Sequence, residues 1–126
     1  MKEKDFNTRF NKWLQHNGKT GAYELKLTKD NSLPFNALAP HQLANLLNAR
    51  HARVVFKIPD AGWTNPFDCF CLASTCAFVV VQFWKPRVKH FYLIDIDEWV
   101  EEEFCSVRKS LTEERANIIG TKYELK

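Results

Sequence analysis

The sequence predicts one domain of the α/β or α+β class, with a single mixed β-sheet of about five strands flanked by helices. Three observations support this prediction. The chain has 126 residues, a length that suits one domain over residues 1–126. Hydrophobic residues make up 45% of it, and ten Phe and four Trp supply a core that needs neither a metal nor disulfides. The apolar residues recur at helical spacing in some segments and in strand-like runs in others.

The first part of the chain predicts a helix, a strand, a loop and a second helix. Over residues 3–15 the apolar side chains fall at i, i+4, i+7 and i+8, which is the stripe of an amphipathic helix, and Gly18 ends it. Residues 22–29 alternate between apolar and polar side chains, which predicts a strand. After the loop DNSLP, Pro40 suits the first turn of a helix over residues 40–50.

The middle of the chain predicts β-structure. Four apolar segments are strand candidates, over residues 53–58, 67–73, 77–84 and 90–95. A long turn separates the first two, and the short turn STC separates the second from the third, so the second and third are expected to form a hairpin. The run AFVVV in the third candidate has no polar alternation, which is typical of a central strand covered on both faces.

Two more helices are predicted near the end of the chain. Asp97 is expected to cap a helix over residues 98–104, whose acidic side chains solvate it. The pattern Ser110-x-x-Glu113 predicts the start of a last helix, and Gly120 its end.

Several classes of protein and of site do not fit the sequence. No apolar run reaches the roughly 18–20 residues of a membrane span, and the charged N-terminal stretch lacks the apolar middle of a signal peptide. We therefore expect a protein of the cytoplasm or nucleoplasm with no membrane partner.

Cys69 and Cys71 alternate with apolar residues and lack the paired spacing of zinc ligands, which favours free thiols over a zinc site. Gly-rich phosphate loops, nucleophile elbows and His-Glu-x-x-His are absent.

The charge pattern permits nucleic-acid binding without requiring it. The formal net charge is only +3. Lys57, Lys85, Arg87 and Lys89 are candidates for phosphate contacts, and Thr28 is grouped with them as a candidate nucleic-acid contact. The alternative interpretation is that the basic side chains form an ordinary solvated edge.

Glu24 and Lys26 are the candidate catalytic pair. Alternation puts their side chains on one face of one strand, with Cα atoms roughly 7 Å apart. A Glu carboxylate is a hard oxygen ligand for Mg²⁺, and a nearby Lys can orient or deprotonate water or neutralise charge on a phosphate. By itself this pair is also a common pattern of an exposed strand. The tetrapeptide YELK recurs at residues 123–126, but we interpret that copy as a chance repeat on an edge strand or tail.

The residues around the pair resemble a known nuclease superfamily. In YELKLTKDNSLPFNALAPHQLANLL, Glu24, Lys26 and Thr28 are followed by a Leu-Pro loop and by a helix that opens with His41-Gln42. This segment resembles the PD-(D/E)xK superfamily, nearest to the bacterial and phage Holliday-junction resolvases. The resemblance covers roughly residues 20–50, with weaker agreement to about residue 95. It implies a restriction-endonuclease-like fold.

The sequence departs from the superfamily pattern at the metal-binding Asp. That residue usually stands on a strand before Glu-x-Lys, but the segment HNGKTGAY contains no Asp. Asp68 is the best substitute, because a carboxylate in a strand of Phe and Cys is costly to bury unless it is paired or bound to metal. We expect the hairpin that carries Asp68 to fold beside the Glu24 strand. The alternative is that Asp68 starts a strand and faces solvent, and Asp60 fits a turn better than a site.

The resemblance implies two further supporting residues. Glu3 extends the inward stripe of the first helix, where resolvase-like members often carry a Glu near the metals. It also fits an ordinary acid in a first helical turn. Gln42 borders the buried stripe of the second helix, where a Gln supports the site by hydrogen bonding in related nucleases. It also fits a surface position.

Together these residues imply a Mg²⁺- or Mn²⁺-dependent DNA endonuclease, bacterial or phage-encoded, that hydrolyses phosphodiester bonds. Junction resolution is the activity nearest to the resemblance. Glu24 and Asp68 are the implied metal ligands, and the implied catalytic residues are Glu24, Lys26, Asp68, Gln42 and Glu3. The implied partners are DNA, including branched DNA, and a second copy of the chain, because symmetric cutting of two strands suits a homodimer. The alternative is a non-catalytic module on the same fold that binds nucleic acid or a protein through its surplus of aromatic residues.

Overall fold

The computed structural model describes residues 3–18, 21–51, 55–58, 69–72 and 75–125. Along the chain these residues form α1 (Glu3–Asn17), β1 (Ala22–Thr28), β2 (Ser32–Pro34), the 3₁₀ turn η1 (Phe35–Ala37), α2 (Pro40–His51), β3 (Val55–Ile58), β4 (Cys69–Leu72), β5 (Ala77–Phe83), β6 (His90–Asp95), α3 (Ile96–Cys105), β7 (Ser110–Thr112), α4 (Glu113–Ile119) and β8 (Thr121–Glu124). Within them, no helix combines the length and apolar character needed to cross a membrane.

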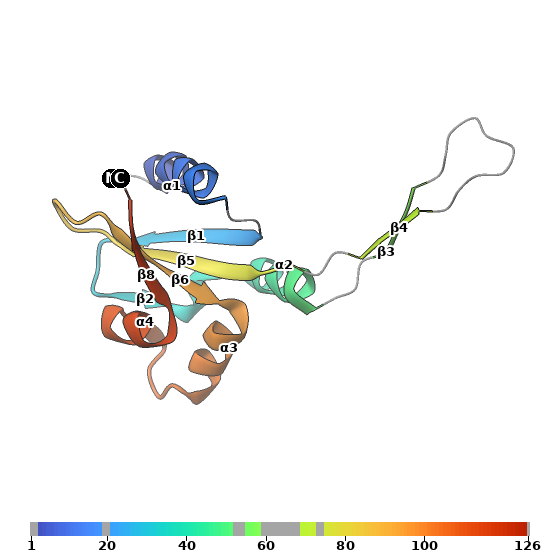
Figure 1. The fold of residues 1–126 in the computed structure, drawn as a ribbon. Helices are drawn as coiled ribbons and strands as arrows, with labels where there is room; N and C mark the ends of the chain where they lie inside the picture. Colours follow the sequence, from blue (N-terminus) through green and yellow to red (C-terminus); the bar gives the residue numbers. More distant parts are fainter. Residues whose placement is uncertain (1–2, 19–20, 52–54, 59–68, 73–74, 126) are drawn as a thin grey trace, which may run out of the picture.

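A mixed four-stranded sheet in the order β1-β5-β6-β8 forms the centre of the fold (Figure 1). β1 runs parallel to β5, whereas β6 runs antiparallel to both of its neighbours. Two small antiparallel pairs, β2 with β7 and β3 with β4, lie outside this sheet. The mixed α and β class is thus confirmed, and the central sheet has four strands in the described part of the chain where the sequence predicted about five.

Helices cover both faces of the sheet, with α1 on one side and α2, α3 and α4 on the other (Figure 1). Alternate residues of β5 supply the two cores, which is why its run AFVVV needs no polar side chain on either face. Val79 and Val81 pack toward the side of α2, and Val80 packs toward α1. All three are 0% exposed, which confirms the prediction of a central strand.

The hairpin predicted between residues 67–73 and 77–84 is wrong. β4 pairs with β3 instead, and Val55 lies opposite Leu72. β1 occupies one edge of β5 and β6 occupies the other, so β5 has no free edge for β4. The segment between β4 and β5 therefore joins strands of two different sheets.

The caps of the last two helices also differ from the prediction. Asp95, not Asp97, caps α3, because β6 extends to Asp95 and the helix starts directly after it. The Asp95 carboxylate accepts a hydrogen bond of 2.9 Å from the backbone N–H of Asp97. Ser110 pairs in β7, so Thr112 caps α4 instead, and its hydroxyl accepts from the backbone N–H of Arg115 at 3.3 Å.

Gln82 is a fully buried polar side chain within the sheet. It lies in register with Leu27 of β1, so it faces the side that α1 covers and not the side of Glu24 and Lys26. It is 0% exposed, and neither of its amide atoms has a hydrogen-bond partner among the described residues. A buried amide without a hydrogen bond lowers the free energy of unfolding, so we expect Gln82 to destabilise the folded protein.

Replacing Gln82 by Met should raise the free energy of unfolding by about 1 kcal/mol, because it removes two unpaired polar atoms and keeps a similar volume. Urea unfolding of both proteins measures the difference. A loss of stability instead would mean that the amide makes a hydrogen bond in solution.

Candidate active site

β1 presents Glu24 and Lys26 on the face of the sheet that α2 covers. Their register partners on β5 are Val79 and Val81, which belong to the core on that side. Lys26 Nζ lies 3.5 Å from Glu24 Oε1. The side chain of Lys26 is 16% exposed and that of Glu24 is 31% exposed, so both are partly shielded and open to solvent on one side. Strand alternation thus forms the pair that the sequence predicts.

Gln42 connects this pair to the start of α2. Its Nε2 donates a hydrogen bond of 2.9 Å to Glu24 Oε1. Its Oε1 accepts one of 3.0 Å from the backbone N–H of Ala39, directly before the first helical residue Pro40. This second bond is the glutamine half of a capping box. Because the Ala39 N–H requires an acceptor, the amide orientation is defined, and its NH₂ group faces the Glu24 carboxylate.

The predicted second ligand Asp68 and the predicted supporting residue Glu3 are not described at the level of their side chains. The side chain of Glu3 lies outside the described residues, and its helix α1 covers the face of the sheet opposite Glu24. Asp68 also lies outside the described residues. β4, which begins directly after Asp68, pairs with β3 in a sheet separate from β1, so the prediction that a hairpin of β4 and β5 carries Asp68 beside the Glu24 strand is wrong. The roles of Asp68 and Glu3 stay predictions.

The residues predicted to contact phosphates differ in how accessible the structure makes them. Thr28 uses its hydroxyl in the turn after β1, where it bonds the Ser32 carbonyl at 3.3 Å and accepts from the Asp30 N–H at 3.1 Å. The side chain of Lys57 lies outside the described residues. The three remaining residues, Lys85, Arg87 and Lys89, are exposed on the turn between β5 and β6.

The second copy of YELK lies on the opposite edge of the sheet from the first. β8 is an edge strand that ends at Glu124 and pairs only with β6 in the described part of the chain. Tyr123 is in register with Phe91 and packs against it with ring centroids 5.9 Å apart. The edge-strand interpretation of this copy is therefore confirmed.

A polar cluster joins α4 to β6 on the same face of the sheet as Lys26. The Glu113 Oε2 atom lies 3.0 Å from both the Tyr92 hydroxyl and His90 Nε2, and Lys85 Nζ lies 3.7 Å from Oε1. Burial raises the pKa of Tyr92 to about 12, and the bond to Glu113 adds to the shift. Burial works against ionisation of Glu113, but hydrogen bonds from His90 and Tyr92 outweigh it and lower its pKa. This cluster stabilises the packing of α4, because each of its polar groups is paired.

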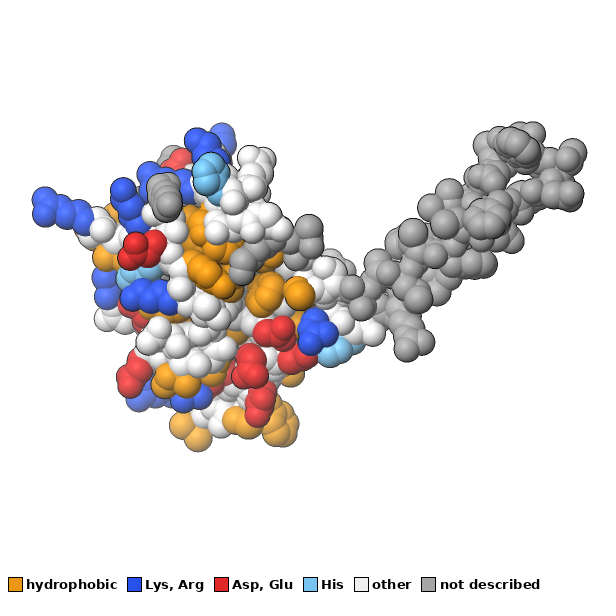
Figure 2. All heavy atoms as spheres, viewed as in Figure 1, with side chains coloured by type: hydrophobic (Ala, Val, Ile, Leu, Met, Phe, Trp, Pro, Cys, Tyr) orange, Lys and Arg blue, Asp and Glu red, His pale blue; other side chains and the backbone are white. Residues whose placement is uncertain are grey.

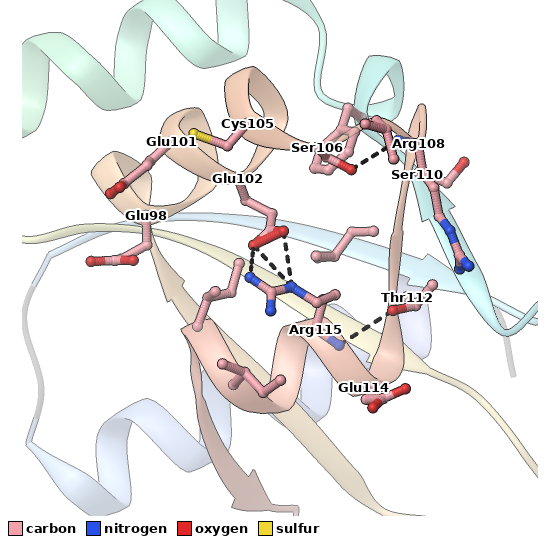
Figure 3. Close-up of a pocket in the computed structure, with 15 residues that line it drawn as sticks. Glu98, Glu101, Glu102, Cys105, Ser106, Arg108, Ser110, Thr112, Glu114 and Arg115 are labelled. Atoms are coloured by element: carbon pink, nitrogen blue, oxygen red, sulfur yellow. Dashed lines mark hydrogen bonds and ion pairs between the residues drawn. The ribbon is translucent and has the colours of Figure 1, made fainter.

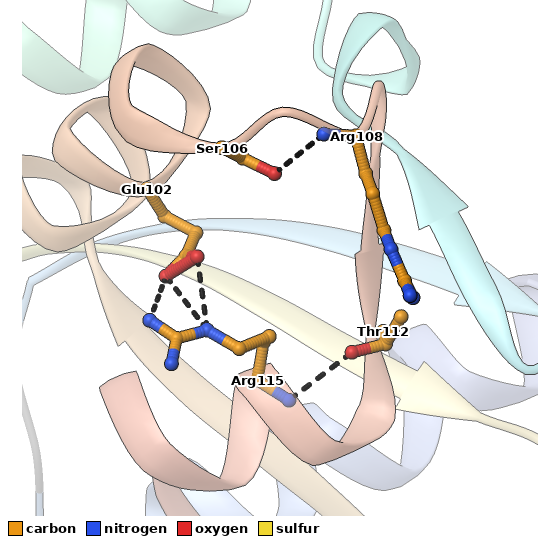
Figure 4. A network of polar contacts seen from close by, with 5 residues as sticks. All are labelled: Glu102, Ser106, Arg108, Thr112 and Arg115. Carbon is orange, nitrogen blue, oxygen red and sulfur yellow. Dashed lines mark hydrogen bonds and ion pairs between the residues drawn. The ribbon is translucent and has the colours of Figure 1, made fainter.

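A hollow of about 610 Å³ lies between α3, β7 and α4 (Figure 3). Arg115 crosses it to Glu102 through a bidentate ion pair, with Nη2 2.7 Å from Oε2 and Nε 3.0 Å from Oε1 (Figure 4). Carboxylates of Glu98, Glu101 and Glu114 also line the hollow. Glu24, Lys26 and Gln42 do not line it, and its carboxylates would repel phosphate. We therefore do not assign the candidate site to this hollow.

Exposed basic side chains gather at one end of the molecule, where the exposed acidic residues Asp5 and Asp30 also lie. Exposed basic side chains lie on α1, after β1 and on the β5–β6 turn, and comprise Lys4, Arg9, Lys12, Lys29, Lys85, Arg87 and Lys89. Figure 2 shows several blue side chains over this end, with red ones among them, and a group of red side chains over the side that carries α3.

Sequence reasoning missed two contacts near the site. It placed Gln42 at the edge of the buried stripe but did not identify its hydrogen bond with the Ala39 N–H. The signal was available, because a Pro at the first helical position and a Gln two residues later indicate a helix cap. It also did not predict that Lys29 lies over the Trp84 ring, 5.5 Å from the centroid. That contact joins the ends of β1 and β5, which only the parallel pairing brings together.

No protein-family model, curated protein or solved structure matches the chain. Among the described residues, no group of three or more His, Cys, Asp or Glu side chains is arranged to hold a metal ion.

Proposed function

We propose that the chain is a DNA endonuclease of the PD-(D/E)xK superfamily that depends on Mg²⁺ or Mn²⁺, with junction resolution as its nearest activity. The observation that carries the proposal is the cluster of Glu24, Lys26 and Gln42. A strand supplies Glu24 and Lys26, and the next helix supplies the amide that holds Glu24. The sequence resemblance depends on the same three residues. A restriction-endonuclease-like fold is part of the proposal, supported by a mixed sheet with helices on both faces.

The chemistry of the site fits a hard divalent cation in part. Both contacts of the Glu24 carboxylate described above use Oε1, which leaves Oε2 as the oxygen for a cation. Carboxylate oxygen is the ligand type that Mg²⁺ and Mn²⁺ prefer. Asp68 is the proposed second ligand. When bound, such an ion activates water and stabilises the charge that develops on the phosphate.

The side chains of the chain have distinct proposed tasks. Lys26 holds the attacking water or a phosphate oxygen with its ammonium group, and its positive charge offsets that of the scissile phosphate. Gln42 fixes the Glu24 carboxylate in position, so that a ligand oxygen is oriented before substrate binds. Phosphates of the DNA backbone contact the basic side chains on α1 and on the β5–β6 turn.

The homodimer is also a proposal, because symmetric cutting of two strands requires two sites. Three large apolar side chains are exposed on the described surface and are available for such a contact. They are Phe104 at 89%, Val107 at 101% and Ile118 at 62% exposure.

Replacing Gln42 by Ala should lower metal-dependent cleavage by about 10- to 100-fold, because the Glu24 carboxylate loses its anchor. It should also lower the free energy of unfolding by about 1 kcal/mol, since the Ala39 N–H loses its acceptor. Cleavage rates and urea unfolding measure the two effects. Gln15→Ala on the exposed side of α1 is the matched control and should change neither.

A non-catalytic nucleic-acid-binding module is the second candidate function. The basic end supports it as well as it supports an endonuclease. Incubation of the wild-type protein with labelled branched and linear DNA, with Mg²⁺ and with EDTA, separates the two. The endonuclease cuts only with the metal ion, whereas the module binds the same DNA and cuts it under neither condition.

A further inference from the structure

A second hollow lies at the basic end of the molecule, between α1 and the end of β5. Its volume is about 510 Å³, and it is lined by Asp5, Thr8, Arg9, Lys12 and Trp84. Four of these residues come from successive turns of α1, and Trp84 is the first residue after β5. An aromatic ring and two cations therefore line one cavity.

Trp84 is held in place from the β1 side. Its backbone N–H donates a hydrogen bond of 2.7 Å to the Thr28 carbonyl, which fixes the residue at the end of β1. Lys29 lies over its ring, 5.5 Å from the centroid, and does not line the hollow. The Trp84 side chain is thus supported by a residue outside the hollow and remains partly exposed.

The cations at this hollow are available to an anion. Within the described residues, Arg9 and Lys12 form no ion pair, and both are exposed. Lys85 and Arg87 follow Trp84 on the β5–β6 turn, so positive charge continues past the ring. Asp5 is the one acidic group in the lining.

We propose that this hollow binds an unpaired nucleotide of a DNA strand, with the base against Trp84 and the adjacent phosphates on Arg9 and Lys12. Aromatic side chains in basic grooves stack bases of single strands with little sequence preference. A base within a duplex has no free face, so the site would select DNA with unpaired nucleotides, as at branches and ends. The inference rests on the proposed function for its DNA substrate, and it extends that function to the structure of the DNA.

The hollow lies on the face of the sheet that α1 covers and the candidate active site on the opposite face, and both are near the end of the edge strand β1. Thr28, whose carbonyl holds Trp84, is two residues after Lys26 on β1, or about 7 Å along the strand. β1 is an edge strand of the sheet, so a nucleic-acid strand that passes its end can contact both places.

The test measures binding without cleavage, in EDTA and in the Lys26→Ala protein. The probes are a fluorescein-labelled dT oligomer of about 12 nucleotides and a blunt duplex of similar length. Trp84→Ala in this background should weaken binding of the dT oligomer by about 5- to 150-fold and change duplex binding by less than about threefold. Trp84→Phe should retain most of the affinity, because Phe also stacks.

Matched controls separate stacking from charge. Arg9→Ala should weaken the binding of both probes. It should also reduce the salt dependence of binding by the amount that one phosphate contact contributes. Lys109→Ala, a lysine outside the hollow, should leave both affinities unchanged. Equal losses for oligomer and duplex with Trp84→Ala, or no loss for either, would overturn the proposal.

A fluorescence measurement keeps the test decisive if Trp84→Ala fails to fold. Addition of the dT oligomer should quench tryptophan emission in the parent protein and not in Trp84→Phe, and an equal quench in both would overturn the proposal. None of these results depends on cleavage. If the wild-type protein cuts no DNA with Mg²⁺, the endonuclease proposal fails, while the stacking site is judged by the binding data alone.

Discussion

Replacing Lys26 by Ala is expected to lower the rate of Mg²⁺-dependent DNA cleavage by about 10²- to 10⁴-fold, which is the usual range for removing a group that handles a proton or stabilises transition-state charge. The Lys26 ammonium lies 3.5 Å from Glu24 Oε1, and its side chain is 16% exposed, so water cannot fully replace it. DNA binding should change little, because the basic side chains on α1 and the β5–β6 turn remain. Single-turnover cleavage and binding in EDTA measure the two effects.

Lys122→Ala is the matched control for this prediction. Lys122 is exposed on the edge strand β8, on the opposite side of the sheet from β1. The same loss of one positive charge there should leave cleavage unchanged. Full activity in Lys26→Ala would mean that cleavage comes from another site. Equal losses of activity in both variants would mean that the lost charge, and not its position, causes the effect.

Replacing Phe10 by Ala is expected to lower the free energy of unfolding by about 3–5 kcal/mol. Phe10 is 1% exposed on the inner side of α1. Its ring lies 5.5 Å from that of Phe91, 5.3 Å from that of Tyr23 and 5.8 Å from that of Trp13. Ala would leave a cavity between α1 and the sheet, and the loss is a large share of the roughly 5–15 kcal/mol by which domains are stable.

Phe104→Ala is the matched control, because the same change removes a ring that is 89% exposed on α3. It should alter the free energy of unfolding by no more than about 0.5 kcal/mol. Urea unfolding measures both variants. Similar values for the two would contradict the burial of α1 against the sheet.

Local patterns in the sequence predicted most of the elements. The stripe of α1, the alternation of β1 and the continuous apolar run of β5 each depend on burial. The structure buries the stripe of α1 and most of the run of β5, and it packs the half-buried apolar side chains of β1 against the core. Gly18, with a φ of 59°, follows α1 in the left-handed conformation that a terminating glycine adopts. Such signals are local, so a single sequence contains them.

Strand pairing was predicted less well, because it depends on competition between distant segments. The short turn STC favoured a hairpin with β5, but β1 and β6 occupy both edges of β5. The same competition moved the helix caps. Pairing of Ser110 in β7 left Thr112 to cap α4, and no property of either residue alone decides between them.

The sequence predicted the residues of the candidate site but not the contacts between distant segments. Glu24 and Lys26 share a face because alternation requires it, and the resemblance identified Gln42 as a supporting residue. The bond from Gln42 to Glu24 spans 18 residues, and only the packing of α2 beside β1 defines its length. Trp84 and Lys29 meet through the parallel pairing of β1 with β5, which no local pattern predicts.

The most direct test of the proposed active site compares the two copies of the same tetrapeptide. Glu24→Gln keeps the size of the side chain and an oxygen for Gln42 but removes the carboxylate that would bind the cation. Glu124→Gln makes the same change on the exposed edge strand β8. With Mg²⁺ or Mn²⁺, the wild-type protein and Glu124→Gln are predicted to cut labelled branched DNA, and Glu24→Gln to leave it intact. Equal cutting by both variants, or binding without metal-dependent cutting by the wild-type protein, would contradict the assignment of Glu24 as a metal ligand of a nuclease.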